Sequence, residues 1–178
     1  MLEGIVREST GKSSVKALRR DGYLIANIYG KGLENINAAF KENEYIRTVR
    51  NKDTLAFPVK VGDKEMNVVV QAYESHPVTG KLLHVDLMVA QDGVTTHYML
   101  PVVPVGEAIG LKNKGLVNVS KTRLRVKAKI EDTPSKIEID VTDMDVGDAK
   151  LIRDLDPIEN VMFTDAPRVS VLSIIKAK

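Results

Sequence analysis

The sequence predicts a mainly β protein, in which an N-terminal domain with two short helices precedes a second β-rich domain. Most of the chain consists of short apolar or β-branched runs with Gly, Asp, Asn or Pro at or near most of their ends, a pattern typical of strands. Only two stretches have apolar residues at helical spacing. Prolines oppose helices through most of the second half, at Pro101, Pro104, Pro134, Pro157 and Pro167.

Five strands are expected in the first domain, over Gly4–Glu8, Tyr23–Tyr29, Leu55–Val61, Met66–Ala72 and Leu82–Ala90. Gly62 and Asp63 separate the third strand from the fourth and predict a hairpin turn. A longer turn is expected at residues 76–80, because the segment His-Pro-Val-Thr-Gly has Pro and Gly at positions that suit a turn.

Two helices are expected, over about Ser13–Asp21 and about Glu42–Arg50. Gly22 follows the first helix, where glycine is favoured just past a helix end. The polar residues Gln91-Asp92-Gly93 mark a boundary, so we expect domains at residues 1–91 and 92–178. In the second domain, strands are expected over Thr95–Val103, Arg123–Ile130, Ile137–Val141 and Arg168–Ile175.

Composition narrows the classes of function. The chain has no cysteine, which excludes disulfides, thiolate metal sites and a cysteine nucleophile and fits a reducing cytoplasm. Aromatic residues make up only 4%, so the core must be aliphatic. No apolar run approaches the roughly 18 residues of a membrane span, and the N-terminus lacks the apolar region of a secretory signal. The net charge of +2 alone says little about nucleic acid.

Basic residues are nevertheless concentrated on the first predicted helix. At the angular spacing of a helix, four of them fall within an arc of about 100°. Val15 and Leu18 occupy the neighbouring arc, which can face a core. This helix can therefore pack by one side and present cations to RNA phosphates with the other, although a merely solvated surface is the alternative. The four cations are Lys12, Lys16, Arg19 and Arg20.

Two other features suit RNA. Arg7 precedes the basic helix, and Tyr29 begins a short Tyr-Gly-Lys-Gly segment, where its ring can stack on a base or bind a phosphate. The Gly-Lys-Gly segment is too short for a nucleotide-binding P-loop, and a plain loop is the alternative.

His84 and Asp86 lie two residues apart on a predicted strand and therefore share a face. No third ligand completes a metal site, no Gly-x-Ser-x-Gly motif supplies a nucleophile, and we expect no cofactor. On an exposed sheet face the pair can read base edges or 2′-hydroxyls, since one group donates and the other accepts. A surface pair without function and a His/Asp-dependent nuclease are the alternatives.

In the second domain, basic residues alternate with apolar ones from Arg123 to Ile130. This pattern predicts a strand with one buried face and one basic face. A solvated strand, whose charges also deter edge pairing, is favoured over a second nucleic-acid surface. The basic residues are Arg123, Arg125, Lys127 and Lys129.

Together these segments resemble one family, bacterial large-subunit ribosomal protein twenty-five. The segment from Arg7 to Gly22, followed by Ala-Asn-Ile-Tyr-Gly at residues 26–30, resembles the opening of that family. Residues 71–77 and then 81–86 resemble its second signature. The second half resembles the extra domain of the long form, the general stress protein CTC type, at residues 101–110, 137–141 and 146–148.

The resemblance implies a structural protein of the ribosome, not an enzyme, whose N-terminal β-barrel binds the irregular internal loop of 5S ribosomal RNA. It implies that the second domain faces neighbouring RNA or proteins of the large subunit, and we expect a monomer off the ribosome. A stress-responsive RNA-binding protein acting partly off the ribosome is the alternative. The family pattern implies RNA contacts, with Arg20 added from helix geometry, at Arg7, Lys12, Lys16, Arg19, Arg20, Tyr29, Gln71, His84 and Asp86.

The chain departs from the family pattern at four positions. Ala17 stands where the family usually has a second basic residue, and Ile25 stands where it usually has proline. Glu74 and Ser75 precede His-Pro, where the family often has Gln-Arg. These differences remove cations from the implied RNA footprint.

Overall fold

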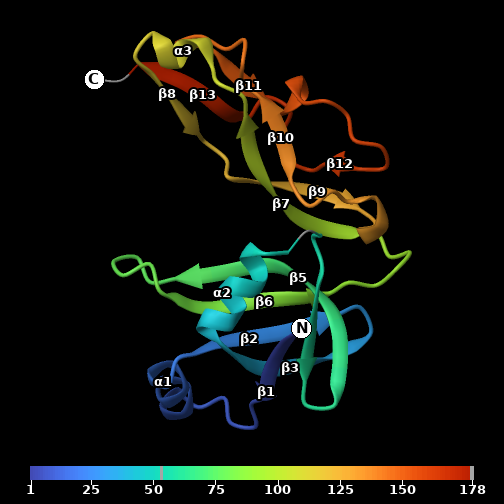
Figure 1. The fold of residues 1–178 in the computed structure, drawn as a ribbon. Coiled ribbons are helices and arrows are strands. Elements are labelled where there is room, and N and C mark those ends of the chain that lie inside the picture. The colour runs from blue at the N-terminus through green and yellow to red at the C-terminus, as the bar shows by residue number, and fades with distance from the viewer. Residues whose placement is uncertain (53, 177–178) are drawn as a thin grey trace. The chain divides into compact units, whose positions relative to one another are not determined.

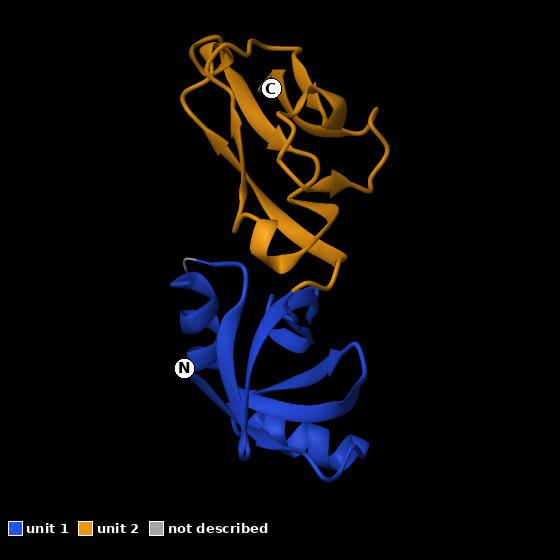
Figure 2. Cartoon of the chain, turned by 90° about the vertical axis from the view of Figure 1, so that its right-hand side faces the viewer, with its two compact units in different colours: residues 1–92 blue, residues 93–178 orange. Residues whose placement is uncertain are grey.

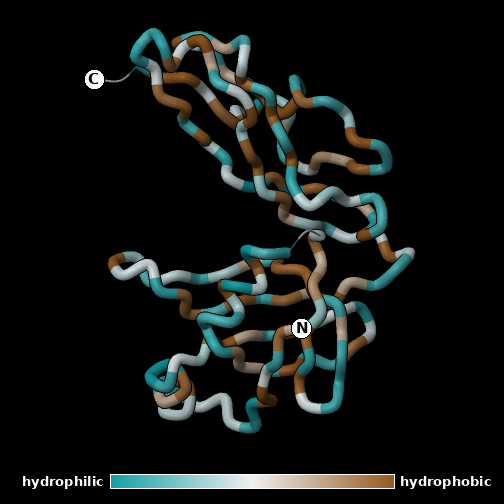
Figure 3. The backbone as a smooth tube through the Cα atoms, in the orientation of Figure 1, coloured by the Kyte–Doolittle hydropathy of each residue, from teal (hydrophilic) through white to brown (hydrophobic). Residues whose placement is uncertain are grey.

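The computed structural model describes residues 1–52 and 54–176. The chain divides into two compact units, Met1–Asp92 and Gly93–Lys178 (Figure 2). Strand is the predominant secondary structure, which confirms the predicted mainly β class. Figure 3 shows hydrophobic and hydrophilic residues interspersed along the strands of both units, as expected for sheets with one buried face.

Unit 1 is a closed barrel, in strand order β1-β3-β2-β6-β5-β4 (Figure 1). Strand β1 closes it by pairing antiparallel with β3 and parallel with β4. Closure leaves no strand of the barrel with an unpaired edge, and it confirms the barrel that the family resemblance implied. The strands are β1 (Leu2–Val6), β2 (Tyr23–Gly30), β3 (Leu33–Lys41), β4 (Phe57–Val61), β5 (Lys64–Ser75) and β6 (Leu82–Val89).

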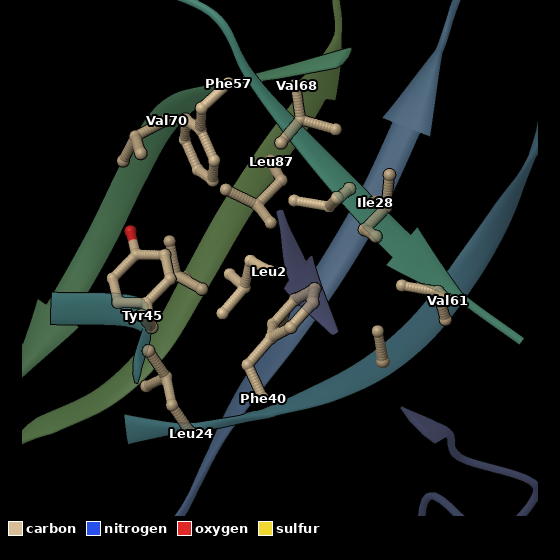
Figure 4. Packing of buried hydrophobic residues seen from close by; sticks show 14 residues of the cluster. Leu2, Leu24, Ile28, Phe40, Tyr45, Phe57, Val61, Val68, Val70 and Leu87 are labelled. Atoms are coloured by element: carbon tan, nitrogen blue, oxygen red, sulfur yellow. The ribbon is translucent and has the colours of Figure 1, made fainter. Parts of the chain in front are cut away.

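Alternate residues of the barrel strands form its core (Figure 4). Most are aliphatic, as the composition predicted, and each strand contributes some, such as Ile28 on β2 and Leu87 on β6. Phe40 of β3 is fully buried among them. Tyr45 of the helix α2 enters the same core and meets Phe57 edge-on, with ring centroids 6.5 Å apart.

Both predicted helices are present in unit 1, as α1 (Lys12–Arg20) and α2 (Glu42–Arg50). Helix α1 packs on β2 and has no fully buried residue; Val15 and Leu18 are half-buried, as expected for its packing side. Gly22 follows α1 with a φ of +80°, a backbone conformation that residues with a Cβ rarely adopt.

The strand prediction missed β3, and several ends differ. The first strand begins at Leu2 and ends at Val6, whereas Gly4–Glu8 was expected. Strand β5 runs to Ser75 and not only to Ala72, so that β5 and β6 extend as a long hairpin to the turn at residues 76–80 (Figure 1). In that turn the Nδ1 of His76 accepts hydrogen bonds from the backbone N–H groups of Val78 and Thr79.

Unit 2 is β-rich and contains two sheets, with strand orders β10-β7-β9-β12 and β11-β13-β8. The four expected strands correspond to β7 (Thr96–Val105), β9 (Arg123–Ala128), β10 (Ile137–Asp140) and β13 (Ser170–Lys176). Three strands and a short helix were not predicted: β8 (Gly115–Val119), β11 (Ala149–Leu151), β12 (Met162–Phe163) and α3 (Ile109–Lys112). Two 3₁₀ turns cover Ile130–Asp132 and Ile152–Asp154, and the first ends the predicted Arg123–Ile130 strand early.

We expect residues 1–92 to fold in isolation, because all six barrel strands and their core cluster lie within unit 1. Circular dichroism and cooperative thermal unfolding would measure this. A fragment that ends at Asp63 lacks β5 and β6, cannot close the barrel, and should stay unfolded. A disordered 1–92 fragment would contradict the expectation that this unit is an independent domain.

Candidate RNA-binding interface

Three polar side chains line up across neighbouring strands on the outside of the barrel. Asn37 of β3 pairs with Asn27 of β2, and Asn27 pairs with Asp86 of β6. The residues on either side of Asn27 along β2 belong to the buried core, so alternation turns Asn27 outward. The same reasoning holds for Asn37 and Asp86. We call these three residues the outer polar row.

Gln71 lies beside the end of this row. The next strand across from Asp86 is β5, where Ala72 pairs with Asp86. The register shifts between Val70 and Ala72, which leaves Gln71 as an additional residue in a bulge. Bulges redirect side chains and are frequent beside functional sites. The bulge thus places the predicted contact Gln71 next to the predicted contact Asp86.

Two amide oxygens at this surface have no hydrogen-bond partner among the described residues, Oδ1 of Asn27 and Oε1 of Gln71. Both oxygen atoms are buried, although the residues are only half-buried. Buried polar atoms are nearly always hydrogen-bonded. Because both side chains are half-buried at an outer face, rotation of the amide would present its oxygen to a donor from a ligand, such as a base amino group or a 2′-hydroxyl. Asn27 was not predicted as a contact.

His84 and Asp86 lie on the same outer face, as their spacing predicted. Nδ1 of His84 and Oδ1 of Asp86 are 3.6 Å apart, too far for a hydrogen bond but close enough for an ion pair if the imidazole is protonated. Their side chains are 29% and 37% exposed. The partly exposed carboxylate of Asp86 can therefore accept a hydrogen bond from a ligand.

Tyr29 lies two residues after Asn27 on β2 and shares its outward direction. Partial burial raises the pKa of the Tyr29 hydroxyl, and the negative charge of Asp86 raises this pKa further. The hydroxyl therefore keeps its proton and remains a hydrogen-bond donor at neutral pH. A donor at this position complements the acceptors of Asn27, Gln71 and Asp86.

The four cations of helix α1 divide into two kinds. Lys12, Lys16 and Arg20 are exposed, and Nε of Arg20 lies 3.8 Å from Oδ1 of Asp21. Arg19 is half-buried, and its Nη2 donates a 2.8 Å hydrogen bond to the carbonyl oxygen of Leu83, the residue before His84. Arg19 thus connects α1 to β6, a positioning role that sequence reasoning did not predict. The contact of Arg19 with an RNA phosphate, which the family resemblance implies, would be additional to this positioning role.

Arg7 lies where the chain leaves β1. Its backbone N–H donates a 2.8 Å hydrogen bond to the carbonyl oxygen of Asn37, which places it beside the outer polar row. Its Nε is buried and has no hydrogen-bond partner in the described part of the chain. The structure therefore brings Arg7, Tyr29, Gln71, His84 and Asp86 to one side of the barrel, with α1 anchored at its border.

Within residues 1–52 and 54–176, no group of three or more His, Asp or Glu side chains is placed to hold a metal ion. In the same part of the chain, every helix is too short or too polar to span a membrane.

Comparison with known proteins defines the class of this protein. A family model described as the Ribosomal L25p family matches residues 2–87, and one described as the C-terminal domain of ribosomal protein TL5 matches residues 95–178. Together with the barrel and its polar outer face, these matches define a structural ribosomal protein, not an enzyme.

Full-length relatives agree with this classification. The chain is 76% identical to a protein of Sulfurimonas denitrificans, 64% to one of Nitratiruptor sp. and 62% to one of Campylobacter lari, over 178 residues that cover 100% of both chains each time. Each of the three relatives is named large ribosomal subunit protein bL25. The chain belongs to the Ribosomal L25p family. The predicted family is confirmed, and the nuclease alternative is set aside.

Proposed function

We propose that this protein is a structural component of the large ribosomal subunit in the cytoplasm, and that unit 1 binds the irregular internal loop of 5S ribosomal RNA. The observation that carries the RNA-binding proposal is the outer polar row together with the unpaired acceptors of Asn27 and the neighbouring Gln71, bordered by a cationic helix. In this proposal, unit 2 faces neighbouring RNA or protein of the large subunit.

The two parts of the interface have different tasks. The exposed cations of α1 contact phosphates, which supplies affinity and orientation but carries no information about sequence. The outer polar row, with Tyr29 and Gln71, contacts base edges and 2′-hydroxyls, which supplies selectivity. Asp86 fits only the second task, since a carboxylate repels phosphate and gains from RNA only by accepting hydrogen bonds.

A footprint of 5S RNA with the full-length protein tests this proposal. We expect protection from hydroxyl radicals at the irregular internal loop, with little protection along the regular helices. A duplex in which the internal loop is replaced by paired bases is the matched control RNA, and it should bind weakly. Equal protection along every helix would overturn the proposed site on the RNA and leave only general affinity for phosphates.

The exposed cations of α1 should act through salt-sensitive affinity. Replacing Lys12 and Lys16 together by Ala should make the slope of log affinity against log salt shallower by about 1.4–1.8 units, since each lost phosphate contact removes roughly 0.7–0.9. Affinity measured over a series of salt concentrations gives this slope.

A matched control removes two exposed cations of helix α2, Arg47 and Arg50, and so causes the same change in net charge. Its slope should stay close to that of the unmodified protein. Equal slopes for the two double variants would show that α1 contributes only to the overall charge.

A further inference from the structure

Unit 2 presents a run of three exposed cations along one strand. Arg125 and Lys127 lie on β9, and Lys129 follows directly after it. The intervening residues Leu124, Val126 and Ala128 are buried, so alternation turns the three cations toward solvent. We call Arg125, Lys127 and Lys129 the β9 basic face.

These cations are not needed to protect a sheet edge. The sequence pattern favoured a solvated strand whose charges deter edge pairing, but β9 lies inside its sheet, between β7 and β12 (Figure 1). Its pairing with β7 runs from Arg123 to Ala128, and on the other side Lys127 pairs with Met162. The carbonyl oxygen of Arg125 also accepts a 3.0 Å hydrogen bond from the backbone of Thr164. The edge-protecting part of that expectation is therefore wrong.

One carboxylate lies close to the β9 basic face, because Oδ2 of Asp165 accepts a 3.3 Å hydrogen bond from the backbone N–H of Arg125. Met99 lies across from Arg125, and Lys127 lies between His97 and Met162. Among the described residues, none of the three cations forms an ion pair.

The carboxylates of Asp165 and Glu131 do not form ion pairs with these three cations and have other partners. Asp165 forms a 3.2 Å ion pair with Lys121, and Glu131 accepts a hydrogen bond from the backbone of Gly93. Three like charges at alternate positions repel one another, and a polyanion laid along the strand would relieve this repulsion.

RNA fits this face better than an acidic protein surface does. Alternate residues of a strand are about 6.6–6.8 Å apart, so the three cations form a line along which the phosphates of an extended RNA strand can lie. The neighbours of the cations are apolar or aromatic: His97 is exposed and can stack on a base, and Met162 is 68% exposed. Carboxylates of an acidic protein could pair with the cations but would not stack on the His97 ring, whereas a nucleotide can do both.

We propose that unit 2 carries a second RNA-binding surface, in which the β9 basic face contacts the phosphates of one RNA strand and His97 stacks on a base of that strand. This surface goes beyond the proposed 5S site of unit 1. It shares no residue with that site, so either proposal can fail while the other holds.

Backbone amide spectra of the isotope-labelled full-length protein test the surface directly. Titration with a short oligouridylate should shift the signals of residues on β9 and of His97 on β7, in addition to any shifts in unit 1. A poly-glutamate peptide of equal length and concentration is the comparison ligand. Unmoved β9 signals would overturn the proposal, and equal shifts with poly-glutamate would replace RNA by an acidic protein partner.

Variants supply the second readout. Replacing Arg125 and Lys127 together by Ala should reduce the salt slope of oligouridylate binding by about 1.4 units, at roughly 0.7 for each lost single-strand contact. Replacing Lys112 and Lys176 removes two exposed cations elsewhere in unit 2 and should leave the slope unchanged.

Both double substitutions are on the surface, so both variants should fold, and an unchanged melting temperature would show that they do. Identical slopes for the two pairs would overturn the phosphate contacts of β9. Footprinting of 5S RNA by either variant should match the unmodified protein, which separates this surface from the site of unit 1.

Discussion

Replacing Phe40 by Ala should lower the free energy of unfolding of unit 1 by about 3–5 kcal/mol, the usual cost of deleting a buried aromatic ring. Phe40 is fully buried in the barrel core, and its ring is the largest side chain that β3 contributes (Figure 4). Since the free energy of unfolding of a whole domain is only about 5–15 kcal/mol, this substitution should leave the barrel only marginally stable. Denaturant unfolding measures the loss.

The absence of a side chain at Gly4 leaves room for the Phe40 ring, so substitutions at the two positions should be coupled. Gly4 of β1 pairs with Phe40 across the barrel seam, and a Cβ at Gly4 would collide with the Phe40 ring. Gly4→Ala should therefore cost about 1–3 kcal/mol in the unmodified protein, by overpacking. In the Phe40→Ala background the same change should cost much less, because the methyl group enters vacated space.

The surface substitution Val78→Ala is the control for this cycle. Val78 is 86% exposed in the turn between β5 and β6, so its loss should change the free energy of unfolding by less than about 0.5 kcal/mol. Additive effects of Gly4→Ala and Phe40→Ala would mean that the two residues do not pack against each other.

Local patterns were enough to predict some elements of the fold. Helix α2 spans Glu42–Arg50 as expected, since its apolar residues recur at helical spacing and Tyr45 enters the core. Glycines marked the turns, and Gly62 and Gly80 have positive φ values of +60° and +68°. These features depend on residues close together in the chain, which is why the sequence alone predicts them.

Elements that depend on distant partners were not predictable in the same way. Strand β3 contains Asn35 and Asn37 and only one β-branched residue, so its local pattern resembles a loop. Pairing with β1 on one side and β2 on the other holds it in the sheet. In unit 2, β11 and β12 have three and two residues, too few for any periodicity to appear.

The candidate site shows the same division. His84 and Asp86 share a face because they are two apart on one strand, which the sequence predicts. The outer polar row runs across strands, and its members Asn27 and Asn37 meet Asp86 only through strand register, which a single sequence does not reveal. The tether from Arg19 likewise joins residues 64 positions apart.

One signal for Asn27 was available in the sequence. Apart from the hydroxyl of Tyr29, it is the only polar side chain in the run Leu-Ile-Ala-Asn-Ile-Tyr at residues 24–29. A polar residue at an outward position of such a strand indicates contact with solvent or a ligand. Its unpaired oxygen in the structure favours the ligand.

Replacing Asp86 by Ala should narrow the preference of the protein for 5S RNA over an RNA duplex without an internal loop. Loss of a hydrogen bond to a base edge costs roughly 1–3 kcal/mol by analogy with base readout in DNA, a factor of about 5 to 150. The affinity of the variant for the control duplex should increase instead, because the substitution removes an anion from a surface that contacts phosphates. Asp86→Asn keeps an acceptor oxygen and should lose less selectivity.

Asp63→Ala is the matched control, because Asp63 is exposed in the turn between β4 and β5 and its loss changes the net charge equally. It should raise affinity for both RNAs by a similar small factor and keep their ratio. Measuring the affinity for both RNAs at one fixed salt concentration gives the ratio of the two affinities for each variant, Asp86→Ala, Asp86→Asn and Asp63→Ala. If Asp86→Ala shifts both affinities by the same factor, as Asp63→Ala should, then the carboxylate contributes only charge. The selectivity of the interface would then have to come from Asn27, Tyr29 and Gln71, whose donors and acceptors carry no net charge.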